Sequence, residues 1–211
     1  MNRCVIIGAS PQTNTEFIRS MILKDDFVIC ADGGLDSVLK ADIIPDILIG
    51  DFDSMPKERL KQCENIRTVV LPVEKDDTDT VSCVRYGMEQ GYRNFVLLGV
   101  TGGRLDHTYA NLHLLKYLEK RNCQGMIMDE NTQIFYTENH FVLENKKGKT
   151  VSVLPFGCES ATVSLSGVKY QAENMVMYSD FPIGISNIVI SDNSKVMVQQ
   201  GGVLIIINRE V

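Results

Sequence analysis

The chain has 211 residues, of which 44% are hydrophobic and 23% charged, a balance typical of globular proteins that excludes a disordered chain. It carries 27 aspartates and glutamates against 21 lysines and arginines, a net charge of −6, which argues against a nucleic-acid binder that neutralises phosphates. No apolar run approaches the roughly 20 residues that span a bilayer, and the start is too short for the apolar part of a secretory signal. We therefore expect a cytoplasmic protein that acts on small molecules, with neither nucleic acid nor membrane as partner.

Up to about residue 130, short apolar runs alternate with helical patterns. The runs are nearly unbroken and rich in Val, Ile and Leu, as in strands covered on both faces; they predict strands over 3–7, 27–31, 46–50, 67–71, 94–99 and 125–128. Apolar residues three or four apart predict helices over 16–24, 35–40, 57–64, 80–90 and 108–121. This alternation indicates an α/β domain whose mainly parallel sheet is flanked by helices.

After about residue 131 the pattern changes to short β-rich segments separated by turn residues. Strands are predicted over 132–137, 140–144, 149–155, 161–165, 174–178, 187–191, 195–199 and 203–208. Such a series is typical of a small antiparallel β-sandwich. We therefore expect two domains, an α/β domain over 1–131 and an all-β sandwich over 132–211.

The six cysteines are scattered and form no CxxC pair. Several lie inside apolar stretches, so we expect them to be reduced and mostly buried, and not to form disulfides or a zinc site.

Aspartates follow four of the predicted strands in the first domain. The carboxyl ends of strands in an open α/β sheet share one edge, where ligands bind, so these loops are expected to bring their aspartates together. The seven aspartates are Asp32, Asp51, Asp53, Asp76, Asp77, Asp79 and Asp106.

Such a cluster needs positive charge, because two carboxylates ~4 Å apart repel by about 4 kcal/mol at an effective dielectric constant of 20. Oxygen ligands without Cys or His at metal spacing indicate a hard cation, and Mg²⁺ typically takes one or two carboxylates together with water and substrate phosphates. The glycine pairs at 33–34 and 102–103 allow close approach of the backbone to a ligand. Lys75 and Arg104 are nearby cations that can neutralise a polyphosphate.

The aspartates, the glycine pairs and the nearby histidine each also have a simpler structural interpretation. An aspartate before a helix commonly caps it, which suits Asp79 or Asp106 taken alone, and a Gly-Gly pair after a strand commonly forms a turn. His107 is either a base or a hydrogen-bonding partner. No GxxxxGK[ST] or strand-linked GxGxxG occurs, so neither a Walker-type NTPase nor a Rossmann dehydrogenase is indicated.

Five strings in order carry a family resemblance: Ala-Asp-Gly-Gly at 31–34, Gly-Asp-Phe-Asp-Ser at 50–54, Asp-Asp-Thr-Asp at 76–79, Gly-Gly-Arg-Leu-Asp-His at 102–107 and Ser-Asn at 186–187. In this order, with an α/β half before an all-β half, the chain resembles thiamine pyrophosphokinase over essentially its whole length. The resemblance implies transfer of the pyrophosphoryl group of ATP to the hydroxyl of thiamine, with Mg²⁺, to give thiamine diphosphate and AMP. It also implies a homodimer whose thiamine site lies where the α/β domain of one subunit meets the β domain of the other.

The resemblance also implies residue roles. It assigns catalysis and Mg²⁺ binding to Asp51, Asp53, Asp76 and Asp79, and it assigns Asp106 to orienting thiamine or accepting its proton. Ser186 and Asn187 become thiamine-site residues. The expected nucleotide-binding residues are Asp32, Gly33, Asp77, Thr78, Gly102, Gly103, Arg104 and Asn131. Some family members place a Trp against thiamine, but this chain has none, which leaves Tyr170 or Tyr178 as substitutes.

Two rival functions stay open from the sequence. The segment 47–54 loosely resembles the strand and DxD pattern of phosphatases with an aspartyl nucleophile, and this interpretation predicts a phospho-aspartate. A non-catalytic nucleotide sensor, whose β half binds a partner, is the other. The phosphatase interpretation leaves the other acidic loops and the β half unexplained, and the intact acidic loops argue for chemistry and against a sensor.

Overall fold

A computed structural model of the chain describes residues 2–11, 13–53, 64–74 and 76–208. The chain divides into two compact units: Met1–Leu114 with Asn122–Asp129, and Leu115–Arg121 with Glu130–Val211. The predicted helix over 57–64 falls, apart from Glu64, outside the described residues. Within the described residues, no helix is both long and apolar enough to cross a membrane.

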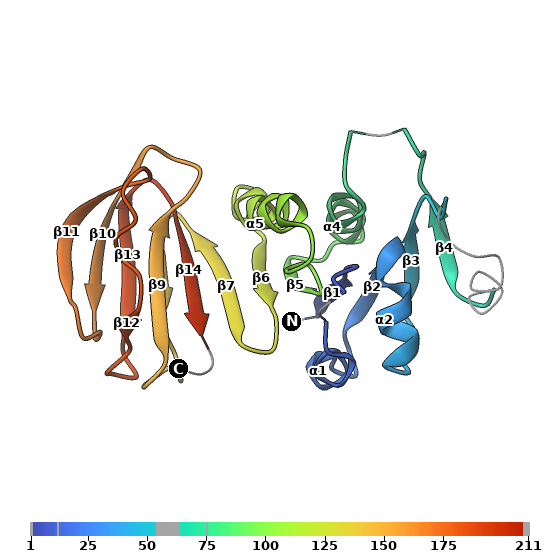
Figure 1. The fold of residues 1–211 in the computed structure, drawn as a ribbon, viewed down its shortest axis with the longest axis horizontal. Helices are drawn as coiled ribbons and strands as arrows, with labels where there is room; N and C mark the ends of the chain where they lie inside the picture. Colours follow the sequence, from blue (N-terminus) through green and yellow to red (C-terminus); the bar gives the residue numbers. More distant parts are fainter. Residues whose placement is uncertain (1, 12, 54–63, 75, 209–211) are drawn as a thin grey trace. The chain divides into compact units, whose positions relative to one another are not determined.

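The first unit contains six parallel strands (Figure 1), so the predicted parallel sheet is confirmed. Their order across the sheet is β6-β5-β1-β2-β3-β4. The strands are β1 (Arg3–Ile7), β2 (Phe27–Ala31), β3 (Ile47–Gly50), β4 (Arg67–Val70), β5 (Asn94–Leu98) and β6 (Gln124–Met128). All four residues of β3 are buried, whereas β4, at the edge, is mostly exposed.

The described helices of this unit begin close to where the sequence places them. They are α1 (Thr15–Met21), α2 (Leu35–Lys40), α4 (Asp79–Glu89) and the first part of α5 (Leu105–Glu119), which belongs to the second unit from Leu115 onward. A short 3-10 turn, η1, covers Asp32–Gly34. Asn14 caps α1 by accepting from the Glu16 and Phe17 N–H groups at 2.9 and 3.2 Å. Helix α1 ends three residues earlier than predicted, because the Asp26 carboxylate accepts from the Leu23 N–H at 2.7 Å and fixes a turn there.

Both faces of the four central strands, β5, β1, β2 and β3, are buried, which explains their unbroken apolar runs. One face holds Val5 and Ile7, in a buried cluster that includes Ile18 of α1 and residues of α2. On the other face α4 packs closely against the strands: a Cβ atom added at Gly87 would lie 2.7 Å from the Phe95 ring and 2.9 Å from the Cys4 sulfur.

The order of the strands creates a switch point beside β1. From β1 the chain runs outward through β2, β3 and β4, and then returns to the other side of β1 to form β5 and β6. The loops after β1 and β5 therefore leave the sheet in opposite directions, and in open α/β sheets ligands bind in the crevice between such loops. The fold places this crevice at the edge where the aspartates were expected.

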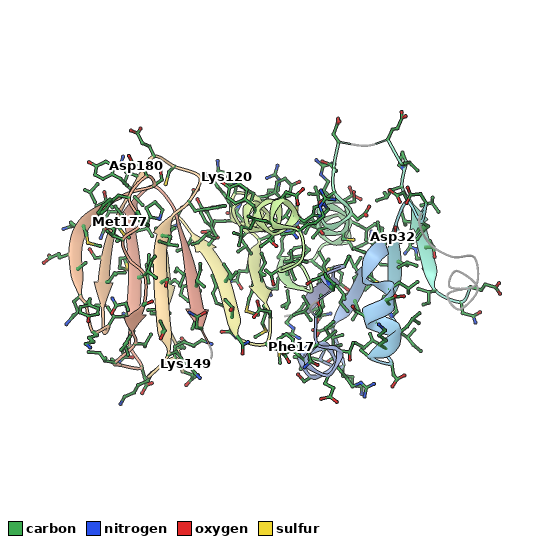
Figure 2. All side chains as sticks on the ribbon, viewed as in Figure 1. Phe17, Asp32, Lys120, Lys149, Met177 and Asp180 are labelled. Carbon is green, nitrogen blue, oxygen red and sulfur yellow. The ribbon has the colours of Figure 1, made fainter. Side chains whose placement is uncertain are left out.

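The second unit is a β-sandwich of two antiparallel sheets (Figure 1), as predicted. One sheet runs β12 (Asn187–Ile188), β9 (Thr150–Pro155), β14 (Val203–Asn208), β7 (Thr132–Thr137); the other runs β11 (Ala172–Tyr178), β10 (Ser160–Ser166), β13 (Lys195–Gln200), β8 (His140–Val142). Their inner faces share one buried core, in which Val153, Val163 and Met177 (Figure 2) are at most 2% exposed. Strand β12 is shorter than the expected 187–191, because Val189 pairs instead with Val168 in a single bridge.

None of the five described cysteines forms a disulfide. Cys4, Cys30, Cys83 and Cys123 are buried and Cys158 is half-buried. The expectation of reduced, mostly buried thiols is confirmed for these five, while Cys63 lies outside the described residues.

Candidate functional site

A pocket of about 600 Å³ lies in the first unit at the switch point beside β1. Its walls are the loop 8–11 after β1, the loop 99–104 after β5, and the segment 77–80 that leads into α4. Gly33 and Asp51, which follow β2 and β3, also line it. The segments that follow five strands, β1 to β5, thus open onto one space, as the strand-end rule predicts.

Two glycines bring the loops after β1 and β5 into contact. The Gly8 N–H donates to the Leu98 carbonyl at 2.8 Å, and a Cβ atom on Gly8 would lie 2.7 Å from the Gly99 carbonyl oxygen. Gly99 has a φ of +64°, which favours glycine. Larger residues would force the two loops apart and change the floor of the pocket.

Asp32, Asp51 and Asp53 form a carboxylate cluster, in which one oxygen from each lies within 4.8 Å of the others. Asp32 lies at the end of β2 (Figure 2) and is 8% exposed; Asp51 is half-buried and Asp53 exposed. Gly50 makes this approach possible, since a Cβ atom there would overlap Cβ of Asp32. Phe52, between the two aspartates of the third strand's loop, has a φ of +55°, a strained conformation of the kind that occurs at binding sites.

The cluster is strongly negative around Asp32. Burial raises the pKa of Asp32, and the charges of Asp79, Asp51 and Asp53 raise it further, although a hydrogen bond from the Phe52 N–H opposes them. Bringing a cation here would relieve this repulsion. A donor set of carboxylate oxygens alone fits a hard divalent ion such as Mg²⁺ better than a softer transition metal.

The aspartates of the acidic segment 76–79 differ in whether they line the pocket. Asp79 is the first residue of α4 and lines the pocket. Asp77 also lines it and forms an ion pair with Arg85. Thr78 lines the pocket and caps α4 by accepting from the Val81 N–H at 3.4 Å. Asp76 is exposed and belongs neither to the carboxylate cluster nor to the pocket lining, and Lys75 lies outside the described residues.

Arg104 and Asp106 form a bidentate ion pair at the start of α5. Nε and Nη2 of Arg104 donate to the two Asp106 oxygens at 3.2 and 2.5 Å. Hydrogen bonding by Arg104 lowers the pKa of Asp106 to about 2, with help from the His107 N–H and the nearby charges. Arg104, Gly102 and Gly103 line the pocket, whereas Asp106 does not.

Asn111 is a pocket residue that the sequence interpretation missed. It is 6% exposed, and its Nδ2 donates to the Val100 carbonyl at 2.8 Å, which ties α5 to the loop after β5. The available signal was a polar residue on the apolar face of α5, in line with Leu114, Leu115 and Leu118. His107 and Ser10 also line the pocket.

In the second unit, Ser186 and Asn187 differ in burial and in the groups that form their hydrogen bonds. Ser186 is exposed with a φ of +58°, and its N–H donates to the Ser152 hydroxyl at 3.1 Å. Asn187 is buried, and its amide bonds both backbone groups of Tyr170, accepting from N–H at 2.9 Å and donating to the carbonyl at 2.7 Å. Tyr170 itself is 62% exposed and Tyr178 54%.

Asn131 lies in the second unit and lines a different cavity, of about 570 Å³. This cavity is also lined by Gln133, Lys146 and Lys149 (Lys149 is labelled in Figure 2). Of the residues expected to hold the nucleotide, Asn131 lines this cavity of the second unit and Asp32 lines neither cavity, whereas the pocket of the first unit is lined by Gly33, Asp77, Thr78, Gly102, Gly103 and Arg104.

Comparison with known proteins identifies the family. Residues 18–127 match the family model of the thiamin pyrophosphokinase catalytic domain, and residues 138–203 match that of the thiamin pyrophosphokinase vitamin B1 binding domain. The chain belongs to the thiamine pyrophosphokinase family. Asn131 and the loop 8–11 fall outside both matched regions.

Individual members of the thiamine pyrophosphokinase family match most of the chain. The thiamine pyrophosphokinase of Bacillus subtilis is 28% identical over 182 residues, covering 84% of this chain and 85% of that protein. Thiamin pyrophosphokinase 1 of Caenorhabditis elegans is 26% identical over 215 residues, covering 96% and 86%.

Solved structures of the family have the same fold. The thiamin pyrophosphokinase of Geobacillus thermodenitrificans superposes with a TM-score of 0.85 at 26% identity, covering 100% of this chain and 98% of that one. The B. subtilis structure gives a TM-score of 0.87 at 23% identity over 100% of both chains, which shows a shared fold.

Proposed function

We propose that this chain transfers the pyrophosphoryl group of ATP to the hydroxyl of thiamine, giving thiamine diphosphate and AMP. The observation that carries the proposal is that Asp51 belongs both to the carboxylate cluster and to the lining of the pocket at the switch point, which the glycine-containing loops and Arg104 also line. This arrangement suits a polyphosphate held with a divalent ion. The membership of both halves of the chain in one family supports the proposal.

We assign Mg²⁺ binding to Asp51, Asp53 and Asp79, directly or through water, with Asp32 as a further carboxylate of the cluster. Asp76 stays a candidate, although its exposed position gives it less support than the others. When bound, Mg²⁺ would neutralise charge on the phosphates and orient them. Asp77, Thr78, Gly33, Gly102 and Gly103 are assigned to nucleotide binding as pocket-lining residues, and Asn131 is the candidate from the second unit.

In the reaction the thiamine hydroxyl oxygen attacks the β-phosphorus of ATP, and the bond from that phosphorus to the oxygen bridging it to the α-phosphorus breaks. AMP leaves with the bridging oxygen, while the hydroxyl proton passes to an acceptor, for which we assign Asp106. Arg104 stabilises the charge of the transferred group. The enzyme's contribution is mainly positioning and electrostatics.

We assign thiamine recognition to Ser186, Asn187 and Asp106, and we propose a homodimer with the thiamine site at the subunit interface. Phe181 and Ile185, close to Ser186 in sequence, are 64% and 56% exposed, and large exposed apolar residues favour an interface. The domains proposed are an α/β nucleotide- and Mg-binding domain over 1–131 and a thiamine-binding sandwich over 132–211. The free thiols support a reducing compartment, the cytoplasm.

The deciding experiment incubates the protein with ATP, Mg²⁺ and thiamine and separates the nucleotides. AMP that forms only when thiamine is present, in equal amount with thiamine diphosphate, supports the proposal. Release of phosphate without thiamine would indicate a phosphohydrolase. ATP binding without turnover would indicate a nucleotide sensor, and omission of Mg²⁺ or addition of EDTA tests the need for a divalent ion.

A further inference from the structure

The ion pair between Arg104 and Asp106 lies where two parts of the proposed site meet. Among the described residues, Arg104 is the only lysine or arginine that lines the pocket. Asp106, which is bonded to it, is outside the pocket lining and is assigned to thiamine. One guanidinium therefore stands between the proposed binding places of the two substrates.

This pair is easily exchanged. The side chains of Arg104 and Asp106 are 71% and 63% exposed, and exposed ion pairs contribute little to stability because water and salt screen them. A triphosphate carries several negative charges and accepts two parallel hydrogen bonds from a guanidinium, as a carboxylate does. A nucleotide in the pocket is therefore a stronger partner for Arg104 than the single carboxylate of Asp106.

Two interactions that do not involve Arg104 hold the Asp106 carboxylate in place. Its Oδ1 also accepts from the His107 N–H at 3.0 Å, and it lies in the first turn of the 15-residue helix α5, where the helix dipole favours a negative charge. Once Arg104 leaves, Oδ1 of Asp106 would keep the bond from the His107 N–H, while Oδ2 would lose the bond from Arg104.

Resting on the proposed function, we propose that Arg104 exchanges partners when the nucleotide binds, leaving Asp106 for the triphosphate and so freeing that carboxylate for thiamine. The exchange removes a positive charge from the place where the thiazolium cation of thiamine must bind. It also prepares proton transfer: the hydroxyl O–H bond breaks, its electron pair forms the bond to the β-phosphorus, and the proton forms an O–H bond with Asp106.

The exchange makes Asp106 a better proton acceptor. In the ligand-free protein, Arg104 is the main cause of the low pKa of Asp106, and the His107 N–H and charge contribute as well. With Arg104 gone only the influence of His107 remains, so the pKa of Asp106 rises towards its ordinary value of 3.8. A carboxylate of higher pKa accepts a proton more readily in a transition state.

The first test needs no nucleotide. The carboxyl carbon of Asp106 is followed by NMR in protein labelled with ¹³C-aspartate, and the signal is assigned with Asp106→Asn. At pH 3.8 we expect an almost fully ionised Asp106 in the original protein and a clearly larger protonated fraction in Arg104→Gln. Arg19→Gln is the matched control, because Arg19 makes a similar exposed pair with Asp42 away from the pocket lining; it should leave Asp106 unchanged. An Asp106 equally ionised in Arg104→Gln would overturn the inference.

The second test measures thiamine binding by calorimetry at pH 7, with and without the non-cleavable analogue α,β-methylene-ATP and Mg²⁺. In the original protein and Arg19→Gln, the analogue should tighten thiamine binding about fivefold or more, the range typical of coupling between sites. In Arg104→Gln the ratio should fall to about one. Equal ratios in all three proteins, or no tightening while the analogue is bound, would refute the exchange. If the protein nevertheless forms AMP with thiamine, the proposed function stands alone; if it neither binds the analogue nor forms AMP, both fail.

Discussion

Gly50 at the end of β3 lies directly against Asp32 at the end of β2, so that a Cβ atom on Gly50 would overlap Cβ of Asp32. The carboxylate cluster therefore depends on the absence of one side chain. Gly50→Ala should push Asp32 away from Asp51 and Asp53 and destabilise the fold by about 1–3 kcal/mol through overpacking.

The measurement for Gly50→Ala is urea unfolding together with thiamine-dependent AMP formation. Gly91→Ala is the control, since Gly91 has open space around it and a φ of +92°, so its substitution strains the backbone without touching the cluster. We expect both variants to lose stability and only Gly50→Ala to lose most of its activity. Full activity in Gly50→Ala would show that the reaction does not depend on the geometry of the carboxylate cluster.

Asp53→Asn should abolish turnover with little effect on stability. Asp53 is exposed and forms part of the carboxylate cluster, so the substitution removes a charge that we assign to cation binding but disturbs no core packing. Steady-state AMP production and the thermal midpoint test this, with the exposed Asp25→Asn as the matched control. Activity within twofold of the original would remove Asp53 from the proposed machinery.

Asp32→Asn should stabilise the protein in the absence of metal. Asp32 is buried beside three other carboxylates that make its ionised form unfavourable, and the amide keeps an oxygen for the Phe52 N–H. In EDTA at pH 7 the thermal midpoint should rise by a few degrees, as expected for about 1 kcal/mol in a chain of this size. With Mg²⁺ and ATP the original protein should gain more stability than the variant. A lower midpoint of the variant in EDTA would contradict the repulsion inferred here.

Asp26 should make stability depend on acid pH. Burial tends to raise its pKa, but hydrogen bonds from Arg3 and the Leu23 N–H, and the charge of Arg3, lower it overall. A lowered pKa in the folded state means that the ion pair stabilises the protein above the ordinary value of 3.8 and that this contribution is lost as the pH falls through the folded-state pKa. Asp26→Asn should lose about 1.5–3 kcal/mol at pH 7, and the difference should shrink below pH 4. Urea unfolding at several pH values measures this; Asp42→Asn, in an exposed pair with Arg19, should change little.

Asn187→Ala should weaken thiamine binding through Tyr170. Without the amide, both backbone groups of Tyr170 lose their bonds to Asn187, at a cost of about 1–3 kcal/mol in stability. We expect a higher KM for thiamine with the KM for ATP unchanged, and no such effect for Asn193→Ala, in an exposed turn. An unchanged thiamine KM would leave Asn187 with a role in folding alone.

The sequence predicted the features that strand geometry dictates. In a parallel sheet the carboxyl ends of all strands share an edge, so Asp32 and Asp51, at the ends of adjacent strands, had to lie close together once those strands were located. The same rule placed Asp79 and Arg104 near the pocket, because short loops leave little freedom of position.

Other features depend on packing that the sequence pattern does not reveal. Asp76 and Asp79 are equally acidic and three residues apart, yet only Asp79 begins a helix that directs it to the pocket. The bond of Asn187 to Tyr170 joins residues 17 apart through the sandwich, and no local pattern predicts it. The sequence also did not predict the ion pair between Arg104 and Asp106. From the sequence, Arg104 was expected to bind the nucleotide and Asp106 to bind thiamine, each independently of the other.

The position of β1 in the middle of the sheet has a consequence for biosynthesis. Strands β2 to β4 all lie on one side of β1, so a nascent chain shorter than about 100 residues leaves the other edge of β1 without its partner β5. An unpaired apolar strand edge readily joins other chains. During synthesis the growing chain therefore carries an incomplete sheet. Its exposed β1 edge is prone to aggregation until β5 emerges and pairs with it.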